Sequence, residues 1–310
     1  MSGVEIIKVK PEDGGMRLNR WFLKYYPSLT LGNFQKLLRT KQIKVDGKRA
    51  ESSLKLSAGQ EIRVPPLQNQ KAEPLHTDIS VKDTLFIQSL VIYKDDNILV
   101  LNKPSGLAVQ GGTNTSRHID GMLEALIYEK NEKPKLVHRI DKDTSGILVL
   151  ARNRQWAEKL TTAFRNHTLQ KTYLALTAPA PKPERGDIKA PLEKVGEKVI
   201  ITDNGKPAHT HFEVLDRIGN KFALLAVSPL TGRTHQIRSH LLHIKSPIVG
   251  DNRYFLGNKR EKYEVLTDKL HLHAYKIDLS SLYNKKCLIK APLPEWFCQD
   301  LVNIGLDFKG

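Results

Sequence analysis

The sequence has very few cysteines and no long apolar run. Cys287 and Cys298 are the only cysteines among 310 residues. They form neither a metal-ligand pair nor a disulfide framework, which favours a reducing compartment. No stretch approaches the ~20 apolar residues of a membrane span, and the first residues lack the apolar core of a secretion signal. We therefore expect a cytoplasmic protein that does not contact a membrane.

Acidic residues are also scarce relative to basic ones. The chain holds 33 Asp and Glu against 49 Lys and Arg, a formal net charge of +16. Such an excess attracts a polyanion, so nucleic acid is the leading partner, although charge that serves only solubility or attraction to anionic lipid is an alternative. Residues 1–67 carry 13 basic and 6 acidic residues. Part of the basic surface therefore lies in an N-terminal module.

Residues 1–67 have the pattern of a small module of helices followed by strands. Apolar residues recur at helical spacing from residue 18 and again from residue 34, on either side of a break at residues 27–32. Asp46-Gly47 predicts a hairpin, and residues 61–64 read as a further strand. This order resembles the S4 RNA-binding module, in which Lys36, Arg39 and Lys44 would bind the phosphate backbone.

The pattern changes after the first module. Residues 68–86 have the composition of a linker, and residues 87–310 are expected to form one larger domain. Strands are predicted near residues 91–101, 147–151, 171–176 and 222–227, and Asn153 is a reasonable cap for a helix that continues to Phe164. A second helix, with Thr234 as a possible cap, would carry Arg238 half-buried. A half-buried guanidinium needs a carboxylate partner, for which Asp141 is a candidate.

Charged residues are densest in a loop that leads into one of these strands. Residues 138–143 carry a His, an Arg, a Lys and two Asp, and residues 143–146 form a turn before the apolar run. A solvated charge cluster would explain this loop equally well from a single occurrence. Residues 138–146, 171–176 and 231–238 together resemble, in order and spacing, the signatures of RluA-type pseudouridine synthases. Residues 102–106 and 205–208 extend the resemblance, and Ile140 departs trivially from the usual Leu.

The resemblance implies a role for each of four residues. Asp141 is implied to be the catalytic aspartate, Tyr173 to pack on a flipped uracil, Arg238 to pair with Asp141, and Arg139 to fill the space that the flipped base leaves. Isomerising uridine breaks the N1–C1′ bond and joins C5 to C1′ with no net oxidation, so no cofactor is expected. Attack by Asp141 on C1′ or C6 and a glycal route with Asp141 as base remain open. An ordinary Tyr is a poor base near neutral pH, which favours packing for Tyr173.

Other readings of the same residues fit less well. The histidines at 235, 240, 243, 271 and 273 lack the spacing of zinc hydrolases, so no metal is expected. Gly111-Gly112 lacks the residues of a phosphate loop, and no glycine-rich loop suggests a methyl-donor nucleotide. Asp141 and Asp143 should point to opposite sides of an extended loop, unlike a glycosidase pair. A protein that only binds RNA is the main rival, and it leaves Asp141 unexplained.

The sequence therefore predicts a two-domain α+β protein: an S4-like RNA-binding module, then a catalytic domain with a mixed, mostly antiparallel sheet and flanking helices. The resemblance is greatest to the RluC subgroup, which acts on bacterial large-subunit (23S) ribosomal RNA. We expect uridine isomerisation in that RNA, with another RNA substrate as the alternative. The sequence leaves the modified uridines and the oligomeric state open.

Overall fold

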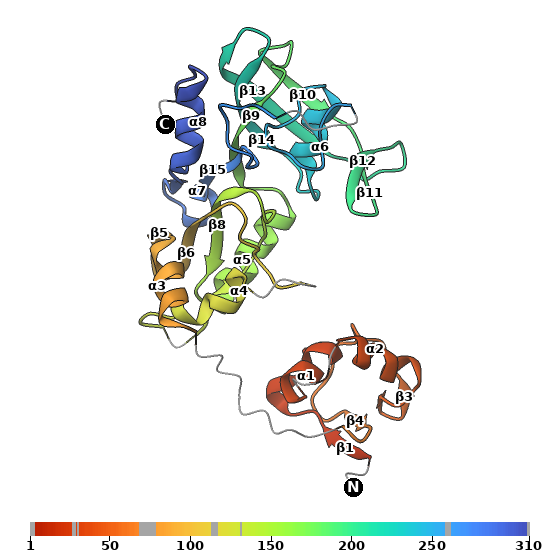
Figure 1. Ribbon diagram of the computed structural model, residues 1–310. Coiled ribbons are helices and arrows are strands. Elements are labelled where there is room, and N and C mark those ends of the chain that lie inside the picture. The colour runs from red at the N-terminus through yellow and green to blue at the C-terminus, as the bar shows by residue number, and fades with distance from the viewer. Residues whose placement is uncertain are drawn as a thin grey trace. The chain divides into compact units, whose positions relative to one another are not determined.

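A computed structural model describes residues 4–26, 29, 31–67, 79–112, 117–130, 132–257 and 262–308. The chain divides into two compact units, Met1–Asp78 and Ile79–Gly310 (Figure 1). None of the described helices has the length and apolar composition that a bilayer span requires.

The first unit contains the predicted helices and strands, and also a strand, β1, that precedes the helices and was not predicted. A small antiparallel sheet has the strand order β1–β4–β2–β3. Trp21, Phe22 and Phe34 of the two α-helices are almost fully buried with Ile43 and Ile62. Its elements are β1 (Glu5–Lys8), η1 (Pro11–Asp13), α1 (Leu18–Tyr25), α2 (Leu31–Arg39), β2 (Lys44–Val45), β3 (Lys48–Arg49) and β4 (Glu61–Val64).

The predicted linker at residues 68–86 differs from the structure in its second part. Residues 68–78 lie outside the described residues, and α3 (Val81–Ser89) begins shortly after them. The Ser80 hydroxyl caps this helix by accepting a hydrogen bond from the Asp83 backbone N–H at 3.0 Å, and Ile87 is fully buried. The second unit thus begins before residue 87, because helix α3 packs against the core of this unit through Ile87.

One large sheet organises the second unit. Its strand order is β10–β13–β14–β9–β15–β8–β6–β5, with β16 beside β15 and β7 beside β8. The β15–β8 pair is parallel and the other pairs are antiparallel, so the predicted mixed, mostly antiparallel sheet is confirmed. The strands are β5 (Val91–Lys94), β6 (Ile98–Lys103), β7 (Lys135–Leu136), β8 (Ser145–Ala151), β9 (Gln170–Thr177), β10 (Arg185–Lys189), β13 (His209–Ile218), β14 (Phe222–Pro229), β15 (Leu272–Asp278) and β16 (Leu288–Lys290).

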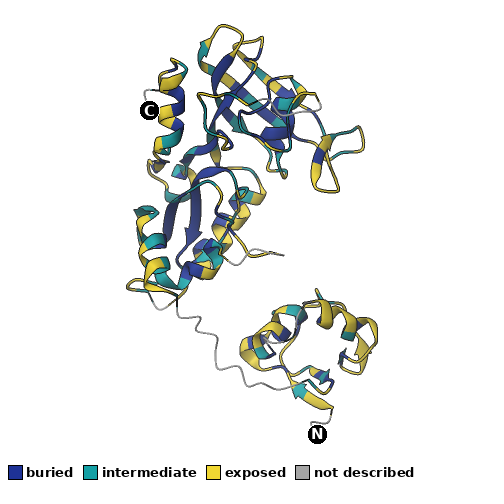
Figure 2. Ribbon diagram, viewed as in Figure 1, coloured by how far each residue is buried: buried dark blue, intermediate teal, exposed yellow. Residues whose placement is uncertain are grey.

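Helices cover both faces of this sheet. Along β9, Ala175 packs in one core cluster with Ile237 of α6 (Gln236–His243), whereas Leu174 packs in another with Phe297 of α8 (Glu295–Asn303). Figure 2 shows the buried strands between these helices. The predicted alternation along residues 171–176 is therefore confirmed, and it places Tyr173 on the same face as Ala175. Shorter elements are α4 (Ile119–Met122), η2 (Leu123–Leu126), α7 (Ser280–Tyr283) and the hairpin β11 (Leu192–Val195) with β12 (Lys198–Ile201).

Two further features hold β8, which begins where the charged loop ends. Helix α5 (Arg154–Arg165) packs beside β8, and the Asn153 side chain caps it by accepting from Trp156 N–H at 2.9 Å, as predicted. Gly146 has a φ of +102°, and a Cβ there would lie 2.3 Å from the Ala274 carbonyl oxygen of β15. Only glycine permits this close parallel pairing, which holds residues 138–145 against the sheet.

Candidate active site

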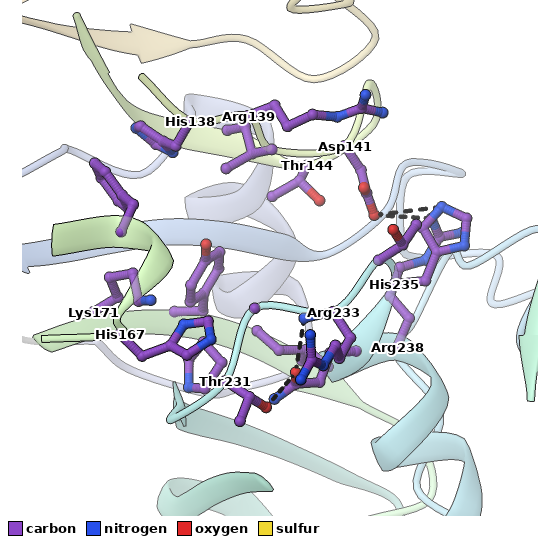
Figure 3. A pocket seen from close by; sticks show the side chains of 18 of the residues that line it. His138, Arg139, Asp141, Thr144, His167, Lys171, Thr231, Arg233, His235 and Arg238 are labelled. Atoms are coloured by element: carbon purple, nitrogen blue, oxygen red, sulfur yellow. Dashed lines mark hydrogen bonds and ion pairs between the residues drawn. The ribbon is translucent and has the colours of Figure 1, made fainter. Parts of the chain in front are cut away.

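A cavity of about 540 Å³ opens where three segments of the second unit meet. The loop at residues 137–144 forms one wall, β9 and the end of α5 a second, and the segment from Pro229 into α6 a third (Figure 3). Asp141, Tyr173, Arg238 and Arg139 all line this cavity. The four residues that the resemblance placed in one site are therefore together.

Arg238 lies between two carboxylates. Its Nε and Nη2 donate to Asp251 Oδ2 and Oδ1 at 2.7 and 2.8 Å, and its Nη1 donates to Asp141 Oδ2 at 3.4 Å. The Arg238 side chain is 4% exposed and that of Asp251 is fully buried. The expected contact with Asp141 is thus present, but the shorter, bidentate pair is with Asp251. Asp141 Oδ1 has no hydrogen-bond partner among the described residues, so it is available to a ligand.

His235 approaches the same oxygen of Asp141 from another side. Its Nε2 lies 3.7 Å from Asp141 Oδ2, and its Nδ1 lies 2.9 Å from the Tyr254 hydroxyl. That hydroxyl also accepts a hydrogen bond from the Val199 N–H at 2.8 Å. His235 has a φ of +50°, an uncommon conformation for a residue with a side chain. Burial lowers the pKa of His235.

His235, rather than Thr234, occupies the cap position of α6. The expected Thr234 cap is wrong, because the backbone turns into the left-handed region one residue later. The preceding turn is held instead by Thr231, whose hydroxyl donates to Gln236 Oε1 at 2.7 Å. The Gln236 amide in turn donates to the His209 carbonyl at 2.9 Å.

Tyr173 supplies an aromatic wall of the cavity. The Tyr173 side chain is partly exposed and packs against two core clusters, one that includes Ile140 and one that includes Ile237. Burial, and then the charge of Asp141, raise the pKa of Tyr173. A hydroxyl with a raised pKa keeps its proton near neutral pH and is a poor base. This geometry favours packing against a planar ligand over proton abstraction.

A buried lysine connects the loop at residues 137–144 to the segment at residues 104–107. Lys103 is fully buried, and its Nζ donates to the carbonyl oxygens of Pro104, Leu107 and Lys142 at 3.0, 2.9 and 2.8 Å. Burial lowers the pKa of Lys103 to about 7, although the negative charges of Asp143 and Asp141 act to raise this pKa. Three acceptors match the three protons of an ammonium group. The carbonyl at residue 142 is thereby fixed directly beside Asp141.

The other charged residues of the loop have separate surroundings. Burial lowers the pKa of His138 to about 3, and its Nε2 accepts from the Val149 N–H at 2.8 Å, so it is a neutral structural group. Asp143 lines a different, smaller cavity than Asp141. The two carboxylates therefore do not face a common bond, in agreement with the expectation. Arg139 is exposed at the cavity edge.

The remaining predicted contacts lie in the first unit. Lys36 and Arg39 are exposed on α2, and Lys44 is half-exposed on β2. Their contact with RNA is a proposal.

Two buried histidines that suggested a metal site have protein partners instead. His240 lies 2.9 Å from both the Thr210 hydroxyl and the Ala190 carbonyl, and His271 lies 2.9 Å from Asp300. Residues 4–26, 29, 31–67, 79–112, 117–130, 132–257 and 262–308 contain no group of three or more His, Cys, Asp or Glu side chains arranged to hold a metal ion.

Sequence reasoning missed Asp251, Tyr254, Lys103 and the position of His235. Lys103 could have been found from the sequence. It belongs to the motif at residues 102–106 and ends a buried strand, which is an unusual position for a lysine. No local signal marks Asp251 or Tyr254, because they lie within the irregular connection between α6 and β15.

Three comparisons agree with this geometry. The model of the RNA pseudouridylate synthase family matches residues 97–243. A protein of Rickettsia bellii named ribosomal large subunit pseudouridine synthase C is 39% identical over 293 residues, covering 91% of this chain and 95% of its own length. A protein of the same name from Vibrio vulnificus is 36% identical and covers 94% of each chain. The structure of human RNA pseudouridylate synthase domain containing 4 shares 27% identity and a TM-score of 0.64, over 74% of this chain and 99% of that one. This chain belongs to the RNA pseudouridylate synthase family.

Proposed function

We propose that this enzyme converts specific uridines of bacterial large-subunit ribosomal RNA to pseudouridine, as an RluC-type synthase in the cytoplasm. The relatives from Rickettsia bellii and Vibrio vulnificus carry that activity in their names and align over nine-tenths of the chain. The observation that carries the proposal is the position of Asp141, which presents one unpartnered carboxylate oxygen to a cavity walled by Tyr173.

Asp141 is the group proposed to react with the extruded nucleoside. Arg238 and His235 both approach Oδ2, so the carboxylate is oriented and Oδ1 faces the ligand. The reaction breaks the N1–C1′ bond, turns the base and forms the C5–C1′ bond, while C5 loses a proton and N1 gains one. An attack by Oδ1 on C1′ or on C6, or its action as a base, is compatible with this arrangement.

Tyr173 and Arg139 are proposed to stabilise the RNA when the target uracil is flipped out. A uracil in a folded RNA must leave its stack, which costs a few kcal/mol. Tyr173 would pack against the extruded ring, and Arg139, exposed at the cavity edge, would fill the vacated space. The planar guanidinium stacks well on neighbouring bases.

The first unit is proposed to be an S4-like RNA-binding module. Its two helices precede β2, β3 and β4, as the resemblance implies, and β1 joins the same sheet ahead of them, which supports this proposal. The exposed basic residues of α2 and the half-exposed Lys44 on β2 offer donors for the phosphate backbone. This module would supply affinity, while the cavity supplies the chemistry.

The test compares Asp141→Asn with the unmutated enzyme on a 23S ribosomal RNA transcript. Pseudouridines are mapped by carbodiimide labelling and primer extension, and RNA affinity is measured by filter binding. We expect isomerisation to fall by more than about a thousandfold in the variant, with RNA affinity nearly unchanged. Asp143→Asn is the matched control, because that carboxylate lines the other cavity.

The outcomes separate the alternatives. A protein that only binds RNA predicts no pseudouridine even from the unmutated chain. An enzyme for another RNA predicts that pseudouridine appears in total cellular RNA but not in the large-subunit transcript. Mapping RNA from cells with and without the gene identifies which uridines depend on it.

A further inference from the structure

Several basic residues line the same cavity as Asp141. They are Lys171 on β9, Arg165 at the end of α5, Arg233 and His167. Figure 3 shows Lys171 and His167 on the opposite side from the labelled His235 and Arg238. Asp141 is the one carboxylate among the described lining residues.

Lys171 is the least expected residue of this group. It is only partly exposed, and burial lowers the pKa of its ammonium group. Its Nζ has no hydrogen bond, carboxylate or aromatic ring as a partner among the residues that the structure describes. A desolvated cation without a partner costs stability, so a structural role is a poor explanation of its position.

His167 and Arg233 line the same cavity as Lys171. The Nδ1 of His167 is buried and has no hydrogen-bond partner in the described chain. Burial lowers the pKa of His167, and the charges of Lys171 and Arg233 lower it further. Gly232 allows the approach, because a Cβ there would lie 3.2 Å from His167 Cε1. The Nε of Arg233 donates to the Pro207 carbonyl at 3.2 Å, which holds the side chain in place.

We infer that Lys171, Arg233 and His167 form a subsite for a phosphodiester of the RNA backbone next to the flipped nucleotide. This inference rests on the proposed function. A phosphate supplies the anion that Lys171 lacks and several acceptor oxygens for the neighbouring donors. A cavity with these basic residues and a single carboxylate excludes a cationic ligand.

The placement of Lys171 also explains what the subsite does. Lys171 and Tyr173 are two residues apart on β9 and project from the same face. One rigid strand therefore holds the proposed base-packing ring and the phosphate-binding cation at a fixed separation. Binding the phosphate beside the extruded base offsets part of the free-energy cost of flipping.

The test measures the salt dependence of RNA binding with full-length protein in an Asp141→Asn background, so that chemistry does not interfere. Affinity for a 23S ribosomal RNA transcript is measured at several salt concentrations. Lys171→Met should reduce the slope of log Kd against log salt by about 0.7, the value for one phosphate contact on single-stranded RNA. Lys171→Arg should restore the slope, and Lys290→Met, an exposed lysine outside the cavity, should leave it unchanged.

Thermal unfolding of the same variants separates binding from structure. Lys171→Met should unfold at the same or a higher temperature, because it removes a partly buried, unpaired charge. An unchanged salt slope, or a clear loss of thermal stability that Lys171→Arg does not restore, overturns the subsite. If the unmutated enzyme makes no pseudouridine while the slope still falls, the proposed function fails, and Lys171 is a phosphate contact of an RNA-binding site without base flipping.

Discussion

Arg238 and Asp251 form a buried, bidentate ion pair directly behind Asp141. The pair distances are 2.7 and 2.8 Å, whereas Arg238 reaches Asp141 at 3.4 Å. Asp251 also accepts from the backbone N–H groups of Arg253 and Tyr254 at 2.9 and 3.0 Å. The carboxylate of Asp251 therefore fixes the guanidinium, and the guanidinium orients the proposed catalytic oxygen.

Replacing Asp251 by Asn should impair both folding and activity. The substitution leaves the buried guanidinium without its main counter-charge, so the free energy of unfolding should fall by about 3 kcal/mol. Pseudouridine formation should fall at least tenfold at a temperature where the variant is folded, because Arg238 is free to turn. Urea unfolding and single-turnover isomerisation measure the two effects. Asp268→Asn, which changes another carboxylate on the same connection, is a control expected to keep activity within about threefold. An Asp251→Asn variant with full activity would contradict the positioning role.

Replacing Lys103 by Met should destabilise the loop that carries Asp141. Three carbonyl oxygens lose their buried donor, so we expect a loss of about 3 kcal/mol in the free energy of unfolding. The rate of isomerisation should fall more than RNA affinity, because the loop that carries Asp141 loses its anchor. Lys94→Met, which removes an exposed pair with Glu129, should cost less than about 1 kcal/mol. Equal losses in the two variants would show that Lys103 has no special role.

His273 should make stability depend on pH in the acid range. It is fully buried between the Ser145 hydroxyl at 2.9 Å and the Ala291 carbonyl at 3.2 Å. Burial lowers the pKa of His273 to about 4, below the ordinary 6.5. The unfolded chain thus binds the proton first, so this stabilising contribution is complete above about pH 6.5 and is lost as pH falls toward 4.

The His273 contribution is measured as a difference between variants. Urea unfolding of the unmutated protein should lose up to about 1.4 kcal/mol per pH unit more than His273→Asn across that interval. His243→Asn, at an exposed position, should follow the unmutated protein. If the free energy of unfolding changed equally with pH in the unmutated protein and in His273→Asn, the prediction would be wrong.

Changing Lys36, Arg39 and Lys44 together to Gln should flatten the salt dependence of RNA binding. Three lost phosphate contacts would lower the slope of log Kd against log salt by about 2. Activity on a short RNA that occupies only the cavity should stay near that of the unmutated enzyme. The matched control changes Lys285, Lys286 and Lys290, which are exposed in the second unit. The same slope in the triple variant and the unmutated protein would remove the first unit from RNA binding.

Local patterns sufficed for much of this protein. Apolar periodicity located α1, α2, α5 and β9, since burial of one face imposes that periodicity on any sequence. The motifs around Asp141, Tyr173 and Arg238 identified the family and the residues that meet in the cavity. The excess of basic over acidic residues by itself indicated a nucleic-acid partner, because a polyanion is what such a charge attracts.

Tertiary structure alone decided which partners these residues have. Asp251 and Tyr254 reach Arg238 and His235 only because the chain returns between α6 and β15, and no spacing rule describes such a contact. The unpartnered Lys171 is equally invisible in the sequence, where it looks like any strand lysine. Local structure follows from neighbouring residues, whereas ion pairs, desolvation and cavities depend on which distant segments the fold brings together.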